Sequence, residues 1–344
     1  MQTDVAASSS FGFSGGFEWL GERGGSTFIT SGAPSLETPI ERAVLGIFGE
    51  GRWNASERAT ITAGVRGERI TRDALAGDPL AFTPRPAFPD ETLTSINPKI
   101  AASFAVFGGT RLRGAFGTGI RPPDAFEIAF TDNSGLKPER SKSGEFGITQ
   151  SAANRAVQLD ATAFFNNYTD LIISVGRTFS GVSRWRTDNI SNARARGAEI
   201  SAAWRAGASF DVRGSYTFLD SEILAVNGSS SAQAPFSVGD RLIRRPRHSG
   251  SIDASFTHAH ASAFAQLQMR GEALDIEPSF GATGGLHDNP GFAVVNIGGA
   301  WRPVKAIEVF VRGLNLFDRK YEEVFGYPAP RRTAYVGARF AVGR

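Results

Sequence analysis

The connections between the predicted strands of this 344-residue chain alternate between short and long, and this alternation limits the folds it can adopt. Segments in which apolar and polar residues alternate are joined in turn by very short polar turns and by long segments rich in Gly, Pro and Ser. A period of two is typical of strands whose two faces meet different surroundings. Short turns on one side and long loops on the other are typical of an up-and-down antiparallel barrel, whereas a soluble sandwich has no reason to gather its long loops on one side.

About fourteen strands are predicted, and many of them are longer than the roughly 9–11 residues that span a bilayer when tilted. They cover residues 11–21, 41–54, 58–72, 96–107, 110–118, 142–151, 156–168, 193–206, 209–222, 246–258, 261–272, 290–302, 305–314 and 331–341. The long loops are predicted near 22–40, 73–95, 119–141, 169–192, 223–245, 273–289 and 315–330. Because the strand count is even, we expect both chain ends on the side of the short turns.

The alternation also assigns the two faces. A charged side chain on the lipid face costs about 2–4 kcal/mol at the bilayer midplane, so charges are predicted in the lumen or beyond the membrane edges. In three central strands the predicted lipid-facing residues are Leu159, Ala161, Ala163, Phe165, Ile200, Ala202, Trp204, Phe210, Val212, Tyr216 and Phe218. Their predicted lumen-facing counterparts are Asp160, Thr162, Phe164, Asn166, Glu199, Ser201, Arg205, Asp211, Arg213, Ser215 and Thr217.

Composition excludes several classes of protein. The chain has no Cys, which rules out disulfides, thiolate zinc sites and iron–sulfur clusters. Its net charge is +3 with scattered basic residues, so no nucleic-acid partner is expected. Its 40 Gly and 27 Phe suit bent strands with an aromatic, lipid-facing surface. Residues 1–5 have neither the basic nor the apolar region of a signal peptide, so we expect the C-terminal part of a longer chain or a mature fragment.

Several blocks of sequence resemble one family. The C-terminal blocks are RGLNLFDRKY (312–321) and GYPAPRRTAYVGARF (326–340). The others are FGTGIRPPDAFEIAF (116–130) followed by LKPERSKSGE (136–145), then NARARGAEI (192–200) and LIRRPRH (242–248). In this order they closely resemble blocks of TonB-dependent outer-membrane receptors, which import siderophores, cobalamin and similar scarce nutrients. The resemblance covers most of residues 95–340.

The resemblance implies a transmembrane antiparallel β-barrel in the bacterial outer membrane. Complete receptors of this family have twenty-two strands and an N-terminal plug domain that contacts TonB. We therefore expect residues 1–344 to form a single, partial barrel domain without a plug. The implied partners are outer-membrane lipid, a small-molecule chelate such as a ferric siderophore or cobalamin, and the TonB complex, reached through a plug domain that lies outside this chain.

Two other functions fit the same alternation. A barrel without a plug would form a passive pore, and a large sandwich would form a soluble all-β binding module. Solubility without detergent would favour the binding module. The sequence upstream of Met1 would separate the other two, because a plug-like domain there favours a receptor and a signal peptide favours a pore.

Ligand contact is predicted at aromatic and arginine residues of the long loops. External aromatics can stack on an anionic chelate while guanidinium groups neutralise it. The candidates are Phe130, Trp185, Arg184, Arg186, Phe236, Arg241 and Tyr327, with Tyr168, Phe280 and Arg244 as further members of the set. The alternative is that the aromatics belong to an interfacial girdle or pack the loops. The predicted lumen arginines are expected to be structural and to face acidic groups of a plug domain: Arg111, Arg113, Arg213 and Arg312.

Catalysis and resident cofactors are not expected. His258 and His260 share a strand face but have no third metal ligand nearby, and Asp132 and Asn133 are explained as well by loop polarity as by calcium binding. The pair Gly117 and Gly119 lacks the third glycine of a dinucleotide fingerprint. No nucleophile elbow or convincing carboxylate pair is found. We therefore predict no catalytic residue, no metal ligand and no cofactor.

Overall fold

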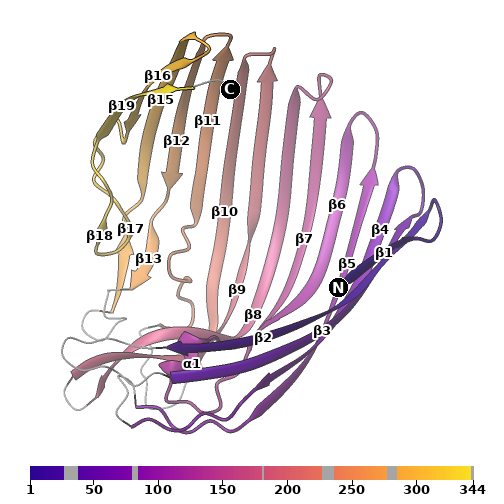
Figure 1. Ribbon diagram of the computed structural model, residues 1–344, viewed down its shortest axis with the longest axis vertical. Coiled ribbons are helices and arrows are strands. Elements are labelled where there is room, and N and C mark those ends of the chain that lie inside the picture. The colour runs from indigo at the N-terminus through magenta and orange to yellow at the C-terminus, as the bar shows by residue number, and fades with distance from the viewer. Residues whose placement is uncertain (27–37, 80–83, 180–181, 227–235, 277–284, 342–344) are drawn as a thin grey trace.

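The computed structural model describes residues 1–26, 38–79, 84–179, 182–226, 236–276 and 285–341. These residues form a curved antiparallel wall whose fifteen strands have the order β1-β2-β3-β4-β5-β6-β7-β8-β9-β10-β11-β12-β15-β16-β19 (Figure 1). The described edges of the wall are β1 and β19, which are not paired with each other. The wall is therefore an open barrel sheet in which almost every strand pairs with its neighbour in sequence.

The strands of the wall are β1 (Gln2–Ala6), β2 (Phe11–Ser26), β3 (Thr38–Asn54), β4 (Ala59–Arg72), β5 (Glu91–Ala105), β6 (Thr110–Arg121), β7 (Glu139–Ala152), β8 (Val157–Phe179), β9 (Val182–Ala206), β10 (Phe210–Val226), β11 (His248–His258), β12 (Ala261–Arg270), β15 (Phe292–Val304), β16 (Ile307–Leu314) and β19 (Thr333–Phe340). The loops contain α1 (Ala125–Ala129) and two small hairpins, β13 (Ala273–Ile276) with β14 (Leu286–Asn289) and β17 (Glu322–Val324) with β18 (Tyr327–Pro328).

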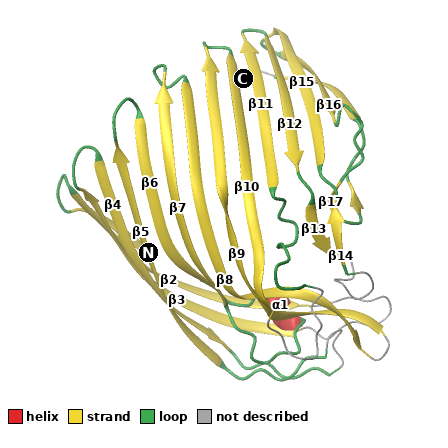
Figure 2. Ribbon diagram, turned by 180° about the vertical axis from the view of Figure 1, so that it is seen from behind, coloured by secondary structure: helices red, strands yellow, loops and turns green. Residues whose placement is uncertain are grey.

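The predicted alternation of short turns and long loops is confirmed. Short turns gather at one end of the wall, which we call the short-turn end, and the long connections gather at the other, the long-loop end (Figure 2). The fourteen predicted strands correspond to β2–β12, β15, β16 and β19. The prediction for the N-terminus is wrong, because the additional strand β1 runs back along β2 and sets Met1 beside Phe17, part of the way up the wall.

Four predicted loops also contain regular structure, two of them as the small hairpins β13–β14 and β17–β18. The segment predicted as a loop over 169–192 continues the β8–β9 hairpin beyond the wall, and the segment predicted over 119–141 contains α1. No helix among the described residues is long and apolar enough to cross a membrane.

Alternation separates two faces of the wall, as predicted. On β9, Ile200 and Trp204 are 52% and 50% exposed on the convex face. The neighbouring Glu199 lines a hollow on the opposite, concave face together with Thr162 and Phe164 of β8. Large apolar side chains left uncovered on this scale are typical of a surface that contacts lipid.

The convex face ends in aromatic residues at the short-turn end. Phe11 and Trp53 are opposite each other on β2 and β3, and Trp204 packs edge to face with Phe210 at 6.1 Å between ring centroids. Exposed aromatics continue around this end as Phe104, Phe256, Trp301 and Phe340. A ring of this kind is typical of the membrane–water interface of outer-membrane barrels.

The buried core lies at the long-loop end rather than inside the wall. One cluster packs Ile223 of β10 against Phe236 and Ile276, and a second packs Ile40 and Leu75 with residues of the loop before β5 and of α1. The wall itself is one layer thick. Most of the buried side chains in the described chain are therefore buried by the loops that fold over its long-loop end.

Candidate ligand-binding hollow and its loop supports

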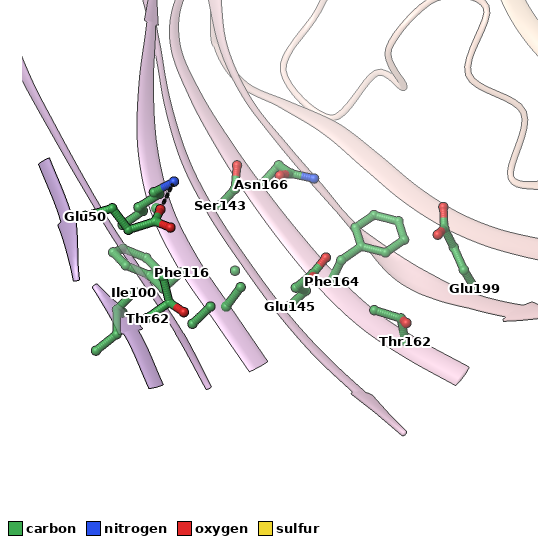
Figure 3. Close-up of a pocket in the computed structure, with 15 residues that line it drawn as sticks. Glu50, Thr62, Ile100, Phe116, Ser143, Glu145, Thr162, Phe164, Asn166 and Glu199 are labelled. Carbon is green, nitrogen blue, oxygen red and sulfur yellow. Dashed lines mark ion pairs between the residues drawn. The ribbon is translucent and has the colours of Figure 1, made fainter. Parts of the chain in front are cut away.

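The concave face is polar and its charges are largely paired across strands. The Arg113 guanidinium donates two hydrogen bonds of 2.6 Å to the two carboxylate oxygens of Asp160, and it also bonds the hydroxyl groups of Thr149 and Thr162. Lys99 forms an ion pair with Glu50. A hollow of about 530 Å³ is lined by Glu50 and Lys99 and, on β8, by Thr162. Figure 3 shows Glu145, Glu199 and Asn166 among the side chains around it.

A second concave hollow of about 650 Å³ lies where the wall meets the long loops. It shares Phe164 and Asn166 with the first, so the two form a continuous track along β8. We call the second one the loop-base hollow. Its lining includes Tyr168, Leu219, Leu242, Ile243, Arg244, Arg245 and Ile276. Apolar walls with a few convergent polar groups are the usual composition of a small-molecule site.

Arg244 is held in this hollow in an unusual backbone conformation. Its φ is +57°, a region that non-glycine residues adopt rarely, and its N–H donates a 2.7 Å hydrogen bond to the Leu274 carbonyl. Its Nε donates to Asp275 Oδ1 at 2.8 Å. Conformations of this kind persist only where the surroundings enforce them and often mark functional sites.

Asp275 joins three loops. The carboxylate is fully buried and accepts hydrogen bonds of 2.8 Å from Arg244 Nε, from the Ile276 N–H and from the Phe325 N–H. Burial raises the pKa of Asp275, but these hydrogen bonds outweigh it and hold the pKa below its ordinary value. The loops after β10, β12 and β16 are therefore connected through one ionised side chain. Stacking of His287 on Phe325, with ring centroids 4.4 Å apart, adds to the contact.

The family-like blocks near residues 116–145 form another support. The Arg121 guanidinium donates to both oxygens of Glu127 at 2.8 and 2.9 Å and to Glu139 at 2.7 Å. These carboxylates raise the pKa of Arg121, with Glu139 contributing most. Glu127 also completes a capping box with Asp124 at the start of α1. Arg121 thus links Glu139, the glutamate of the LKPE segment, to the short helix α1.

This support is tied to β9 by buried polar residues. Thr187 donates through its hydroxyl to the Glu127 carbonyl at 2.5 Å and through its N–H to the Phe130 carbonyl at 2.8 Å. Asn189 donates to the Lys137 carbonyl at 2.9 Å and accepts from the Lys137 N–H at 2.7 Å. The loop between β6 and β7 therefore packs against the wall with its backbone groups bonded.

The candidate loop residues fall into different environments. Phe130 and Phe236 are each 5% exposed and pack the loops, the alternative role considered for them. Arg241 faces Glu272 at 3.3 Å and Asp288 at 3.7 Å, while Tyr327 is 66% exposed on β18. The side chains of Trp185, Arg184 and Arg186, and all of Phe280, lie outside what the structure describes. The loop-base hollow brings together Tyr168 and Arg244 from the wider set.

The lumen arginines have partners on the wall itself. Arg113 binds Asp160, and Arg213 donates to Asp211 at 2.8 Å. Arg111 donates to the Ser103 hydroxyl at 3.2 Å, and the Arg312 guanidinium lies 5.7 Å from the centroid of Phe310. A structural role for Arg113 and Arg213 therefore needs no acidic group from another domain.

Within the described ranges, no three His, Asp or Glu side chains are grouped so that they could hold a metal ion. His258, the last residue of β11, stacks on Phe256, and His260, in the turn before β12, is near the Arg302 carbonyl.

A polar concave face, an apolar convex face with an aromatic ring, short turns and long loops define an outer-membrane β-barrel. Residues 2–316 match the family described as TonB dependent receptor-like, beta-barrel. The chain belongs to this family, whose members are outer-membrane receptors and transporters. The described wall continues beyond the match through β19.

Named relatives agree with this assignment. The iron-regulated outer membrane virulence protein of Vibrio cholerae is 23% identical over 95% of this chain and 48% of its own length. The vitamin B12 transporter BtuB of Vibrio vulnificus is 27% identical over 60% of this chain and 30% of its own length. The chain spans about half the length of the first of these relatives.

Solved structures share the fold. The copper transporter OprC superposes with a TM-score of 0.73 at 18% identity, covering 96% of this chain and 54% of OprC. The siderophore receptor PiuA of Acinetobacter baumannii superposes with a TM-score of 0.74 at 12% identity, covering 98% of this chain and 54% of PiuA.

Proposed function

We propose that this chain forms the barrel wall and ligand-capturing loops of a TonB-dependent outer-membrane receptor that imports a scarce nutrient such as a ferric siderophore or cobalamin. The observation that carries the proposal is the loop-base hollow, which joins the external loops to a polar track along the lumen side of β8. Further support comes from family membership and from relatives named for iron regulation and for vitamin B12 transport. Residues 1–344 are proposed to act as a single barrel domain, with the TonB complex working through a plug domain outside them.

The chemistry of the hollow favours a ligand with anionic oxygens on an apolar body. Arg244 uses Nε to bind Asp275, and its two terminal nitrogens donate no hydrogen bond to any described residue. Arg245 is exposed beside it and forms no ion pair within the described part of the chain. Two such guanidinium groups can bind carboxylate, phosphate or catecholate oxygens, while Tyr168 and Leu242 contact the ligand body. Arg241 and Tyr327 are proposed as contacts nearer the loop tips.

Equilibrium binding tests this function directly. The full chain in detergent is titrated with ferric citrate, a ferric catecholate and cyanocobalamin, and saturable binding of at least one is expected. The double variant Arg244→Gln/Arg245→Gln should weaken that binding at least tenfold, since two charge-assisted contacts are lost. Arg58→Gln/Arg155→Gln removes the same charge at the short-turn end and should leave binding unchanged. A folded chain that binds none of the probes, or a double variant that binds like wild type, would overturn the proposal.

The passive-pore alternative predicts a different result. A steady pore needs a closed wall, whereas the described wall has the unpaired edges β1 and β19. We therefore expect no steady conductance from the chain alone in a planar bilayer, and large steady channels would favour the pore. The exposed apolar convex face argues against a soluble binding module.

A further inference from the structure

A third hollow, of about 500 Å³, lies on the concave face at the short-turn end. Its lining includes Arg58 from the turn before β4, Arg111 near the start of β6 and Arg155 from the turn before β8. Arg111 lies two residues from Arg113 and donates to the Ser103 hydroxyl at 3.2 Å, so it is on the same concave face. We call this space the short-turn hollow. Three arginines from separate parts of the chain are thus gathered around it.

The described lining of the short-turn hollow contains no acidic residue. Apart from its arginines it consists of neutral residues such as Thr149 and Gln158. The three arginines are exposed and form no ion pair with any residue that the structure describes. By contrast, Arg113 and Arg213 on the same face each bind an aspartate. Because a cleft lined by one sign of charge concentrates counter-ions, the short-turn hollow presents an uncompensated positive charge to an anion.

The turn that carries Arg155 has a strained backbone. Ala153, Asn154 and Arg155 have φ values of +49°, +53° and +68°, in the left-handed region that residues with a side chain adopt rarely. Two other short turns place glycine in this region, Gly108 with φ +55° and Gly207 with φ +68°. Glycine would relieve the strain at position 155 as well. An arginine kept in such a conformation indicates a function for its side chain.

The neighbouring space along the rim is different in charge. Arg155 also lines an adjacent hollow of about 440 Å³, which contains Arg205 and Arg213. There the Asp211 carboxylate is 2.8 Å from Arg213 Nε and 4.0 Å from Arg205 Nε, so these cations have a counter-charge. The uncompensated charge is therefore concentrated in the short-turn hollow.

The size and charge of the short-turn hollow suit a small phosphate anion. A space of about 500 Å³ holds an anion with several oxygens and part of its hydration, since a water molecule occupies about 30 Å³ in the liquid. Guanidinium groups bind phosphate oxygens through paired hydrogen bonds, and the Gln158 amide can donate another. A phosphate monoester carries about −1.5 to −2 charges near pH 7, so a compact anion with one or two phosphate groups balances three arginines better than a single carboxylate does.

We propose that the short-turn hollow binds a small multivalent phosphate anion, a diphosphate or an organic phosphate, through Arg58, Arg111 and Arg155. The site is at the opposite end of the wall from the loop-base hollow and shares no lining residue with it. It opens on the polar concave face rather than on the apolar convex face, so the phosphate belongs to a free compound and not to a lipid headgroup. The site therefore does not depend on which nutrient the receptor carries.

Calorimetric titration of the full chain in detergent with sodium diphosphate tests the site. The background for all variants is Arg244→Gln/Arg245→Gln, so that the cations of the loop-base hollow do not contribute. Saturable binding of diphosphate is expected in this background. Adding Arg111→Gln/Arg155→Gln should weaken it at least tenfold, because two charge-assisted contacts are lost. No saturable binding in the background, or unchanged affinity after this addition, would overturn the proposal.

The single change Arg155→Gly separates binding from folding. It removes the guanidinium group and also relieves the positive φ, so affinity for diphosphate should fall at least threefold while the urea midpoint of unfolding stays the same or rises. A purely structural role for Arg155 predicts the reverse. Unchanged affinity together with a lower urea midpoint would overturn the proposal.

A matched control removes the same charge elsewhere at the short-turn end. Arg52→Gln/Lys305→Gln alters two exposed residues outside the described lining of the hollow and should bind diphosphate like the background. A loss equal to that of Arg111→Gln/Arg155→Gln in this control would overturn the site. Competition by a glutamate-rich peptide as strong as that by free diphosphate would overturn the choice of phosphate. Equally strong competition by phosphatidylglycerol micelles would overturn the choice of a free compound.

Discussion

Replacing Asp275 by asparagine should open the joined loops while leaving the wall intact. The carboxylate is fully buried and accepts two hydrogen bonds at Oδ1, from Arg244 and the Ile276 N–H, and one at Oδ2, from the Phe325 N–H. Asparagine has the same shape but only one acceptor oxygen. In its best orientation the amide keeps Oδ1 in place and turns its NH₂ toward the Phe325 N–H, so two donors face each other.

The size of the effect follows from these contacts. An unsatisfied buried donor costs about 1–3 kcal/mol, and converting the Arg244 contact from charged to neutral costs about 1 kcal/mol more. Arg244 keeps 43% of its side chain exposed, so its charge remains solvated without the carboxylate and adds no further penalty. The free energy of loop opening should therefore fall by about 3 kcal/mol, which is about 150-fold in the opening equilibrium.

Hydrogen–deuterium exchange measures this opening locally. The Phe325 and Ile276 amides should exchange about a hundredfold faster in Asp275→Asn, while peptides from β9 keep their wild-type rates. Asp288→Asn is the control, because its carboxylate is 61% exposed and 3.7 Å from Arg241, a surface pair that contributes less than about 1 kcal/mol. Wild-type exchange at Phe325 in Asp275→Asn, or an equal change in the control, would contradict the role of Asp275 in joining the loops.

Two more predictions concern ion pairs elsewhere in the chain. Arg113→Met should destabilise the wall by about 2 kcal/mol in urea unfolding, because it leaves Asp160 without its cation. The double variant Arg113→Met/Asp160→Met should recover at least half of that loss. A double variant less stable than the single one would contradict this prediction. Hydrogen bonds from Arg331 and the Arg332 N–H lower the pKa of Asp318 to about 2. The stabilisation of the folded loop by ionised Asp318 is therefore complete above the ordinary carboxyl pKa and is lost as the pH falls through about 2. Protection of the Arg332 amide from hydrogen exchange, relative to its intrinsic exchange rate, should hold at pH 4 and disappear near pH 2. Loss of that protection already at pH 5 would contradict the assignment.

The wall was predictable because each of its faces meets a different solvent. The alternation of Glu199 with Ile200 sets the lumen and lipid faces of β9 whatever the loops do. The strand β1 escaped prediction because five residues are too few to show a period. The Asp124–Glu127 capping box predicts the start of the short helix α1, and it lies inside one of the blocks that resemble the family.

The supports of the loop-base hollow were harder to foresee. Asp275 binds Arg244 and Phe325, which are 31 and 50 residues away in the sequence. No local sequence pattern predicts a contact of that kind. The positive φ of Arg244 is likewise imposed by the packing of two loops. The prediction for Arg244 selected it as a cation near aromatics, whereas its position depends on a buried carboxylate that composition alone does not single out.

A single-cysteine scan along β9 tests directly whether the convex face of the wall contacts lipid. The chain has no Cys, so each substitution from residue 199 to residue 204 carries the only reactive thiol. An environment-sensitive fluorophore in lipid vesicles should report an apolar setting, quenched from within the bilayer, at Ile200, Ala202 and Trp204, and an aqueous setting at Glu199 and at positions 201 and 203. A period of two would establish the convex face as the lipid face of an outer-membrane barrel. Uniform aqueous exposure along the six positions would contradict it.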